Sequence, residues 1–548
     1  MLLVSHSSAQ IQSEQNFVIT SELVDKFYSA LSSDEESHDE LVNYLTKFTD
    51  FRYTISQISD SVNATLTNAN SLSNSKKKLE IESNIWELLI LLTRFESEKD
   101  QAGKIHGQIH SSTTFNHNAT ANETRNLNNQ TVDLDASFTS PNLALDNLTK
   151  NDLEYTKAKV ILNWLETQFQ EQNRLKQFHN PGAFANISHY RENTLDQLIR
   201  NKIDPNSSRI SKELTKNGMN PDFPYINKSY WHSNIDKSDD SKLSQTLWCL
   251  LKAGQMDEIK NLLIKSGQHW RWITFFKEPQ SILNETIKAF AWESGITSVG
   301  SGMNEFDNAI YAINISGDIS KVLKVCHTWQ EKLWAYLKIF IDVKEQTQIK
   351  ERVSQFDIYG FDVEDGDDDI TVQDREIDLN IPGQVHKQLP NDYWKQEFSQ
   401  FSEVVAAAVN LAESDSYGRL VRSILTNDTD LLVDSLTEIN SPRFAAHIGI
   451  LNGKVFETFI PIYCRELLDL VKKESCKSKE LMSEFISAKL PIIYDILPFY
   501  LSKIVDKDIM LEYFGELISY AGNDVKLRDS IIESGLSFGI RGVLEETC

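Results

Sequence analysis

The chain contains 548 residues, of which 40% are hydrophobic, but only 21 glycines and 12 prolines. Because both turn-forming residues are scarce, long stretches can be helical, and a β-sandwich or β-barrel is not expected. The net charge of −24 would repel nucleic acid and anionic lipid, so we expect no direct nucleic-acid binding. No apolar run is long enough to cross a bilayer, so we expect no membrane insertion either.

The first part of the chain alternates between polar and apolar sequence. Residues 1–20 are polar, and we expect them to be disordered. Helices are predicted in 21–100, where Ile85 to Leu92 is apolar nearly all round and therefore predicts a buried helix. Residues 101–150 are rich in Asn and Thr, a composition that cannot offset the entropy of ordering the chain. We predict a disordered insertion there.

Residues 151–350 predict a stack of amphipathic helices, beginning with Leu153 to Phe169. In Ser241 to Phe340 the helices are short and end at glycines such as Gly254 and Gly295. Such short helices are unstable alone in water, so each must pack on its neighbours, as in a helical solenoid. The residues predicted to face the core are, helix by helix, Leu243, Leu247, Leu250 and Leu251; Met256, Ile259, Leu262 and Leu263; Leu283, Ile287, Phe290 and Ala291; Phe306, Ala309, Ile310 and Ile313; Ile319, Val322, Leu323 and Cys326; and Leu333, Leu337, Phe340 and Ile341. Thr328 and Glu331 predict a capping box at the start of the last of these helices.

An acidic linker is predicted at 351–390, and its run of carboxylates suggests a calcium loop. With Gly366 at the sixth position of an EF-hand loop, however, Phe361 and Val372 would occupy the first and twelfth positions, where carboxylates are required. A solvated loop is therefore the better interpretation. Helices resume in 391–548 without a fixed repeat period, which disfavours a regular TPR or HEAT array.

The sequence contains no convincing catalytic, cofactor or metal motif. Gly535 to Gly539 has the spacing of a hydrolase nucleophile elbow, but the segment before it is predicted to be helical and the last histidine, His447, precedes it. Cys326 and His327 are adjacent rather than spaced for zinc, so a buried thiol is the better interpretation of Cys326. Phosphate-loop and dinucleotide-loop patterns are also missing. We therefore expect no enzyme, no cofactor and no metal.

Aromatic residues crowd together directly after Gly267, in greater number than one helix stripe needs. They could fill the core between adjacent helices, or they could form a partner surface, because aromatic and arginine side chains are favoured anchors of interfaces. The candidate partner-binding residues are His269, Trp270, Arg271, Trp272, Ile273, Phe275 and Phe276.

Several strings carry a family resemblance. They are Leu251 to Glu258, Ser266 to Trp272, Asn308 to Ile313 and, most specific of all, Ser316 to Tyr336. These strings resemble the stem nucleoporin of the Y-shaped outer-ring complex of the nuclear pore, which is the one-hundred-seven-kilodalton class of vertebrates and its smaller yeast form. Arg443 to Ile448 resembles a helix of that family's return leg.

The resemblance implies an all-α fold, the ancestral coatomer element, which is an irregular helical solenoid folded back on itself. The first trunk helices would be 21–100, the crown and central stack 151–350, and the return trunk helices 391–548. The implied function is that of a structural scaffold in the outer ring at the nuclear envelope, which supports pore assembly and thereby the transport of protein and mRNA.

The resemblance also implies a partner. The crown would bind the crown of the neighbouring stem nucleoporin, with the contact at His269 to Phe276. Family members continue into a C-terminal domain that binds the tip subunit, whereas this sequence stops at Cys548, so binding of the tip subunit is doubtful. Two other interpretations stay open: a subunit of a vesicle coat or tethering complex with the same fold, and a solenoid adaptor with an unrelated ligand.

Overall fold

The computed structural model describes residues 49, 79–95, 148–149, 152–176, 234–266, 268–276, 285–298, 304–358, 388–410, 415–439, 441–452, 458–475, 484–522 and 524–540. Within these ranges every regular element is a helix and no strand occurs, which confirms the predicted all-α fold class. The predictions for residues 1–20, for 101–147 of the Asn/Thr-rich insertion and for 359–387 of the acidic linker lie outside the described residues.

The chain forms two compact units. Residues 1–113 and 414–548 make up one of them, here called the early–late unit, and residues 114–413 make up the other, here called the middle unit. Residues 391–408, which the sequence assigns to the return trunk, pack within the middle unit instead.

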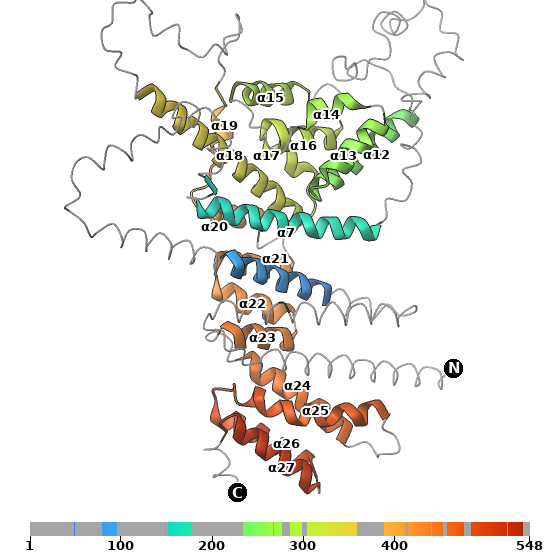
Figure 1. Ribbon diagram of the computed structural model, residues 1–548, viewed down its shortest axis with the longest axis vertical. Helices are drawn as coiled ribbons and strands as arrows, with labels where there is room; N and C mark the ends of the chain where they lie inside the picture. Colours follow the sequence, from blue (N-terminus) through green and yellow to red (C-terminus); the bar gives the residue numbers. More distant parts are fainter. Residues whose placement is uncertain are drawn as a thin grey trace, which may run out of the picture. The chain divides into compact units, whose positions relative to one another are not determined.

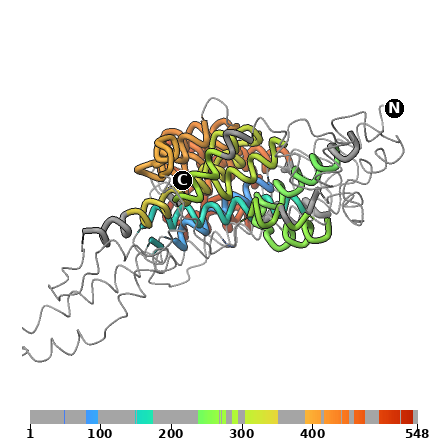
Figure 2. The backbone as a smooth tube through the Cα atoms, turned by 90° about the horizontal axis from the view of Figure 1, so that it is seen from above, coloured from blue at the N-terminus to red at the C-terminus, as the bar shows by residue number. Residues whose placement is uncertain are grey.

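The middle unit is built around one long helix, α18 (Trp329–Ile358), which packs against helices from before and after it in the chain. Figure 1 shows α7 crossing this group, and in Figure 2 the cyan trace of α7 runs beside the green trace of α12, against which it packs. The other elements of the unit are α7 (Leu153–Lys176), α12 (Asn234–Lys252), α13 (Met256–Lys265), α14 (His269–Phe275), α15 (Glu285–Ser298), α16 (Glu305–Tyr311), the π-helical turn η2 (Ala312–Ser316), α17 (Ile319–Val322), the 3₁₀ turn η3 (Leu323–Val325), α19 (Asn391–Trp394) and α20 (Phe401–Ala408).

Polar contacts accompany the apolar packing of α7 on α18. The hydroxyl of Tyr155 donates a hydrogen bond to Glu345 at 3.0 Å, and Lys344 forms an ion pair with Asp152 at 3.0 Å. Burial raises the pKa of Tyr155, and the neighbouring Glu345 raises it further, so this hydroxyl stays protonated and remains a donor. These contacts fix the lengthwise position of α7 along α18.

Most of the predicted apolar stripes are buried in this unit. All four leucines of α12 and all four predicted core residues of α18 are buried. The capping box is also confirmed, because Thr328 Oγ1 accepts from the Glu331 amide and Glu331 accepts from the Thr328 amide, each at 3.3 Å. Cys326 is buried, as predicted, and burial raises the pKa of its thiol to about 12.

Helix α15 contradicts two of the predictions. Ile287 and Phe290, expected in the core, have exposed fractions of 52% and 45%. The helix also continues through Gly295, where the sequence predicts a stop. A glycine inside a helix costs only about 1 kcal/mol relative to alanine, so it permits a stop without enforcing one.

The early–late unit is a succession of helices in which each packs on a close neighbour along the chain, as in an irregular solenoid. Its helices are α21 (Ser416–Thr426), α22 (Thr429–Ile439), α23 (Pro442–Asn452), α24 (Phe459–Ser475), α25 (Glu484–Leu501), α26 (Lys507–Tyr520) and α27 (Val525–Ser537). Gly535 and Ser537 of the hydrolase-like pattern lie in α27, so no strand precedes that serine.

One further helix, of residues 79–95, joins this unit from the early part of the chain. The Glu82 carboxylate accepts two hydrogen bonds from the guanidinium of Arg443, and the ring of Trp86 packs edge-on against Phe444 at 5.5 Å. Figure 1 shows this blue helix beside the orange helices of the return leg. The chain therefore folds back on itself within this unit, and Arg443 lies in a segment that carries the family resemblance.

Candidate partner-binding site

The aromatic segment forms the short helix α14, whose two faces differ sharply. Arg271 and Phe275, four residues apart and so on one face, have exposed fractions of 1% and 3%. On the opposite face His269 is exposed, and Ile273 has an exposed fraction of 77%. The predicted cluster is therefore divided between the core and the surface.

Arg271 fixes α14 to two other helices through a buried polar network. Its guanidinium donates hydrogen bonds to Asp307 of α16 and to Ser244 of α12, both at 2.9 Å, and it lies 3.8 Å from Asp240. Asp307 is itself buried. Removing one member of such a pair leaves an uncompensated buried charge, which costs about 3–5 kcal/mol. Arg271 therefore holds α14 against α12 and α16, and its side chain is too deeply buried to contact a partner.

The phenylalanines of the cluster pack inward, and Trp272 lies at the boundary. Phe275 meets Tyr311 edge-on at 6.1 Å, and buried Phe276 stacks on Trp272 at 5.5 Å. The Nζ of Lys260 in α13 lies over the Trp272 ring, 5.5 Å from its centroid. Trp272 is thus half-buried, and its ring contacts both Phe276 and Lys260.

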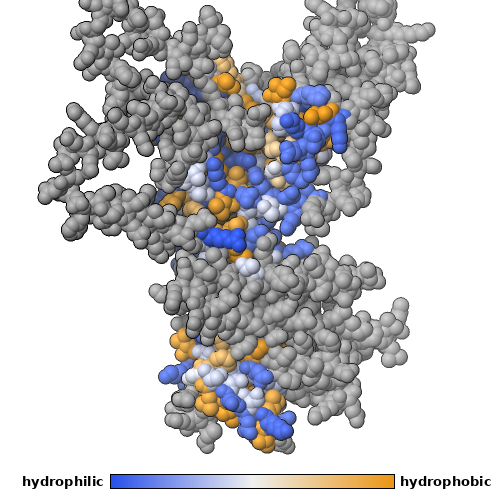
Figure 3. Space-filling view, viewed as in Figure 1, coloured by the Kyte–Doolittle hydropathy of each residue, from blue (hydrophilic) through white to orange (hydrophobic). Residues whose placement is uncertain are grey.

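The surface part of the predicted cluster therefore consists of His269, Trp272 and Ile273. Ile264 is also exposed, at 46%, and it lies in α13, which packs against α14. The side chain of Trp270 lies outside the described residues. Figure 3 shows hydrophobic atoms at the surface over α14 and α15, the helix that carries exposed Ile287 and Phe290. These exposed apolar residues make α13, α14 and α15 the candidate elements for a protein–protein contact.

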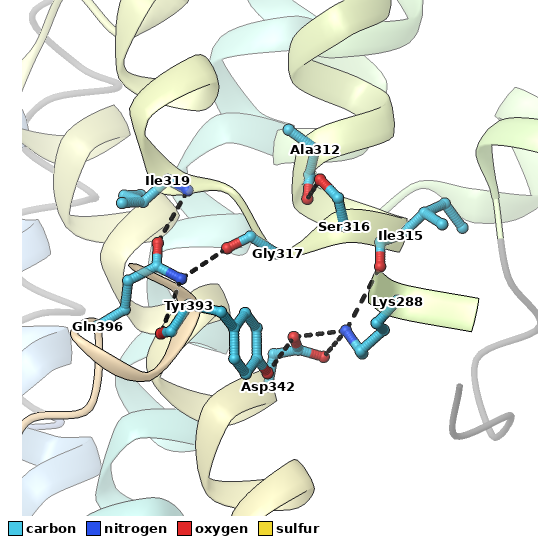
Figure 4. A network of polar contacts seen from close by, with 9 residues as sticks. All are labelled: Lys288, Ala312, Ile315, Ser316, Gly317, Ile319, Asp342, Tyr393 and Gln396. Carbon is cyan, nitrogen blue, oxygen red and sulfur yellow. Dashed lines mark hydrogen bonds and ion pairs between the residues drawn. The ribbon is translucent and has the colours of Figure 1, made fainter. Parts of the chain in front are cut away.

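A second buried network fixes α15, and sequence reasoning missed it. Figure 4 shows Lys288 of α15 pointing inward at the carboxylate of Asp342 in α18, with its Nζ 2.6 and 2.7 Å from the two oxygens. The Tyr393 hydroxyl donates to the same carboxylate at 3.0 Å. Burial raises the pKa of Tyr393, and Asp342 raises it further, so the hydroxyl keeps its proton and can donate.

Gly317 makes room for this network. It has a φ of +77°, and a Cβ there would lie 2.7 Å from the Tyr393 ring, so no larger residue fits without displacement. The Gln396 side chain closes the same region by donating to the Gly317 carbonyl at 2.9 Å and accepting from the Ile319 amide at 3.0 Å. Through Tyr393 and Gln396, the segment after residue 387 forms hydrogen bonds with α18, with Gly317 at the end of η2 and with the start of α17 (Figure 4).

A sequence signal for these networks did exist. Asp342 interrupts the apolar run from Phe340 to Val343, and Lys288 stands between Ile287 and Ala289. A charge inside an apolar run predicts a buried ion pair, because an isolated buried charge is too costly to retain. The sequence does not reveal which charges pair, since 54 residues separate these two.

Among the described residues, no group of three or more His, Cys, Asp or Glu side chains could hold a metal ion. Within the same ranges no helix is both long and apolar enough to cross a membrane.

Comparison with known proteins decides the family. Residues 76–540 match the model of the family described as nuclear pore protein 84 / 107. The chain belongs to this family. It is therefore a nuclear pore protein of the nuclear envelope, and the predicted resemblance to the stem nucleoporins is confirmed.

Curated relatives from several organisms agree with the family assignment. The chain is 24% identical over 235 residues to the human nuclear pore complex protein Nup107, a match that covers 40% of this chain and 24% of the relative. It is 26% identical over 217 residues to Nup107 of Drosophila melanogaster, covering 35% of this chain and 24% of the relative. Nucleoporin nup107 of Schizosaccharomyces pombe matches at 24% over 146 residues, covering 24% of this chain and 17% of the relative. The matched segments span about a quarter or less of these relatives.

Proposed function

We propose that the chain is a structural scaffold subunit of the outer ring of the nuclear pore, and that it acts by assembly rather than by catalysis. Its membership of the nuclear pore protein 84 / 107 family carries the proposal.

The partner that we propose is the neighbouring stem nucleoporin, bound through the middle unit. The contact surface is the exposed half of the predicted cluster, consisting of His269, Trp272 and Ile273 together with Ile264. Arg271, Phe275 and Phe276 are buried beneath it and hold it in place. Ile273 is the most exposed large apolar side chain of the described residues, at 77%, and its contact with a partner would remove that apolar area from water.

The decisive experiment is the substitution Ile273→Asp. A carboxylate at the centre of an apolar interface would be desolvated and unpaired, which costs several kcal/mol. A loss of about 3 kcal/mol weakens binding more than a hundredfold. Because Ile273 is exposed in the free chain, the melting temperature should stay within about one degree of the parent.

Ile462→Asp is a matched control, since Ile462 is also exposed, at 48%, but lies in α24 of the early–late unit. Calorimetric titration with the purified neighbouring nucleoporin should show loss of binding for Ile273→Asp and parental binding for the control. Equal affinity for the parent and Ile273→Asp would overturn the proposed surface. Co-purification with vesicle-coat subunits in place of nucleoporins would overturn the proposed function.

A further inference from the structure

We propose that the Lys288, Asp342 and Tyr393 network is a positioning device that sets the rotation of α15 about its axis. It thereby presents Ile287 and Phe290 as a second part of the partner-binding surface. The inference rests on the proposed contact with a neighbouring nucleoporin. It adds α15 to that contact, because two of the residues that the sequence assigns to the core, Ile287 and Phe290, are exposed.

Hydrophobic burial alone does not select the rotation of α15, because both of its faces are apolar. Ala289, Ala291 and Trp292 point inward and are buried, whereas Ile287 and Phe290 point outward. A helix with apolar residues on both sides gains similar burial in more than one rotation. Some other interaction must therefore distinguish the observed rotation from its alternatives.

The buried ion pair supplies that distinction. Lys288 has an exposed fraction of only 1%, and its ammonium group contacts both oxygens of Asp342. Turning α15 outward would return the ammonium group to water and leave the Asp342 carboxylate buried without its cation, which is strongly unfavourable. Buried ionic groups serve in some proteins to fix a unique register, and this network has the geometry for that role.

Two contacts from the segment after residue 387 hold the same rotation. The Leu389 amide donates to Glu285 in the first turn of α15 at 3.0 Å, and the Tyr393 ring meets Trp292 edge-on at 6.1 Å. The inner side of α15 is therefore held at three residues, Glu285, Lys288 and Trp292. Each contact lies on the inner side, which leaves the outer side to the two exposed apolar residues.

The occupant of this outer side is an apolar helix face of the partner that receives Ile273. Figure 3 shows the exposed apolar atoms of α14 and α15 on the same visible side of the middle unit. The rim carries charges of both signs, with exposed Lys260 on α13 and exposed Glu293 on α15. A partner face with an apolar centre and a rim of mixed charge complements it.

The test replaces both charges of the network, in the double variant Lys288→Met with Asp342→Leu. Replacing a buried ion pair by apolar residues of similar volume is often neutral or stabilising. The Tyr393 hydroxyl loses its acceptor in this variant, which costs about 1–3 kcal/mol, so the melting temperature should fall only slightly. Affinity for the neighbouring nucleoporin should nevertheless fall about tenfold or more, because α15 no longer holds one rotation. If the network only stabilised the fold, affinity would fall only to the extent that the melting temperature falls.

A labelling experiment reads the rotation directly. Ile287→Cys, introduced into the parent and into the double variant, is treated with a maleimide, and the modified peptide is followed by mass spectrometry. We expect fast labelling in the parent background and labelling slowed several-fold in the double variant. If the double variant does not fold, Tyr393→Phe, which keeps the ring and removes one hydrogen bond, serves in both assays with a smaller effect in the same direction.

The matched control is Lys338→Met with Glu166→Leu, which removes an ion pair of 3.0 Å between α18 and α7. It should leave both the affinity and the labelling rate unchanged. Parental affinity and parental labelling in the Lys288 and Asp342 double variant would overturn the inference, even where Ile273→Asp abolishes binding and so supports the proposed function. Self-association of the parent through this face, seen by sedimentation and lost in Ile287→Asp, would overturn the assigned occupant.

Discussion

The contact between Glu82 and Arg443 predicts how firmly the early helix of residues 79–95 is held on the return leg. Both side chains are largely buried, with exposed fractions of 6% and 13%, and the pair forms two hydrogen bonds. Burial lowers the pKa of Arg443, but Glu82 outweighs that effect and raises the pKa overall, so the guanidinium stays charged. In Glu82→Ala the cation remains buried without its partner.

Such a broken buried pair costs about 3–5 kcal/mol. The substitution also removes the acceptor of the Trp86 indole, which lies 3.3 Å from Glu82. If this cost lowers the free energy of local opening of the helix, amide protection in 79–95 should fall about a hundredfold to several-thousandfold. Hydrogen exchange followed by mass spectrometry on the peptides of this helix measures the change directly.

Two control variants separate a specific effect from a general one. Glu82→Leu with Arg443→Met removes both charges together, and protection should return to near the parental level. Arg465→Met breaks an ion pair with Glu516 whose members are 37% and 29% exposed, and it should change stability by less than about 1 kcal/mol. Unchanged protection in Glu82→Ala would show that the apolar contacts of the helix hold it without the ion pair.

Two further predictions concern single residues in the two units. Gly317→Ala should destabilise the middle unit by more than about 2 kcal/mol, because a left-handed backbone costs alanine about 1–2 kcal/mol and its Cβ would collide with Tyr393. Gly522→Ala is the control, because Gly522 has a φ of +59° and no atom lies within 4 Å of the added Cβ. It should lose only the backbone part of the free energy of unfolding. Equal losses for the two variants in urea titrations would refute the collision with Tyr393. Burial and the nearby Arg443 cation hold the pKa of His447 well below its ordinary value, and its ring pairs with Tyr500 at 2.9 Å. The unfolded chain protonates this histidine near pH 6.5 and the folded chain does not, so stability should fall below that pH by up to about 1.4 kcal/mol per unit, and His447→Gln should remove this dependence.

Some features of this protein follow from sequence because they depend on residues close together in the chain. The stripes of α12 and α18 have the spacing of one helical face, and each predicted member is buried. The capping box joins Thr328 and Glu331, which are three residues apart, so its geometry is set as soon as the helix forms. The low glycine and proline content likewise indicates the all-α class before any packing is known.

The candidate site could be predicted only in part. The sequence correctly indicates a dense aromatic segment after Gly267, but it cannot assign Arg271 to the core and Ile273 to the surface. The reason is that the partners of Arg271, Ser244 and Asp307, lie in helices before and after α14. Whether a residue faces inward depends on where those partners stand after folding.

Tertiary structure alone decided which face of α15 is buried. The stripe rule places Ile287 and Phe290 inward, since it counts only the hydrophobic effect. The buried pair of Lys288 and Asp342 favours a different rotation, in which Ala291 of the predicted stripe stays buried but Ile287 and Phe290 are exposed. A buried carboxylate without its cation is costlier than two half-exposed apolar side chains. The sequence by itself determined the helices and most of their stripes, whereas the pairing of charges 54 and 361 residues apart, made only after folding, decided how those helices are turned and where the chain closes on itself.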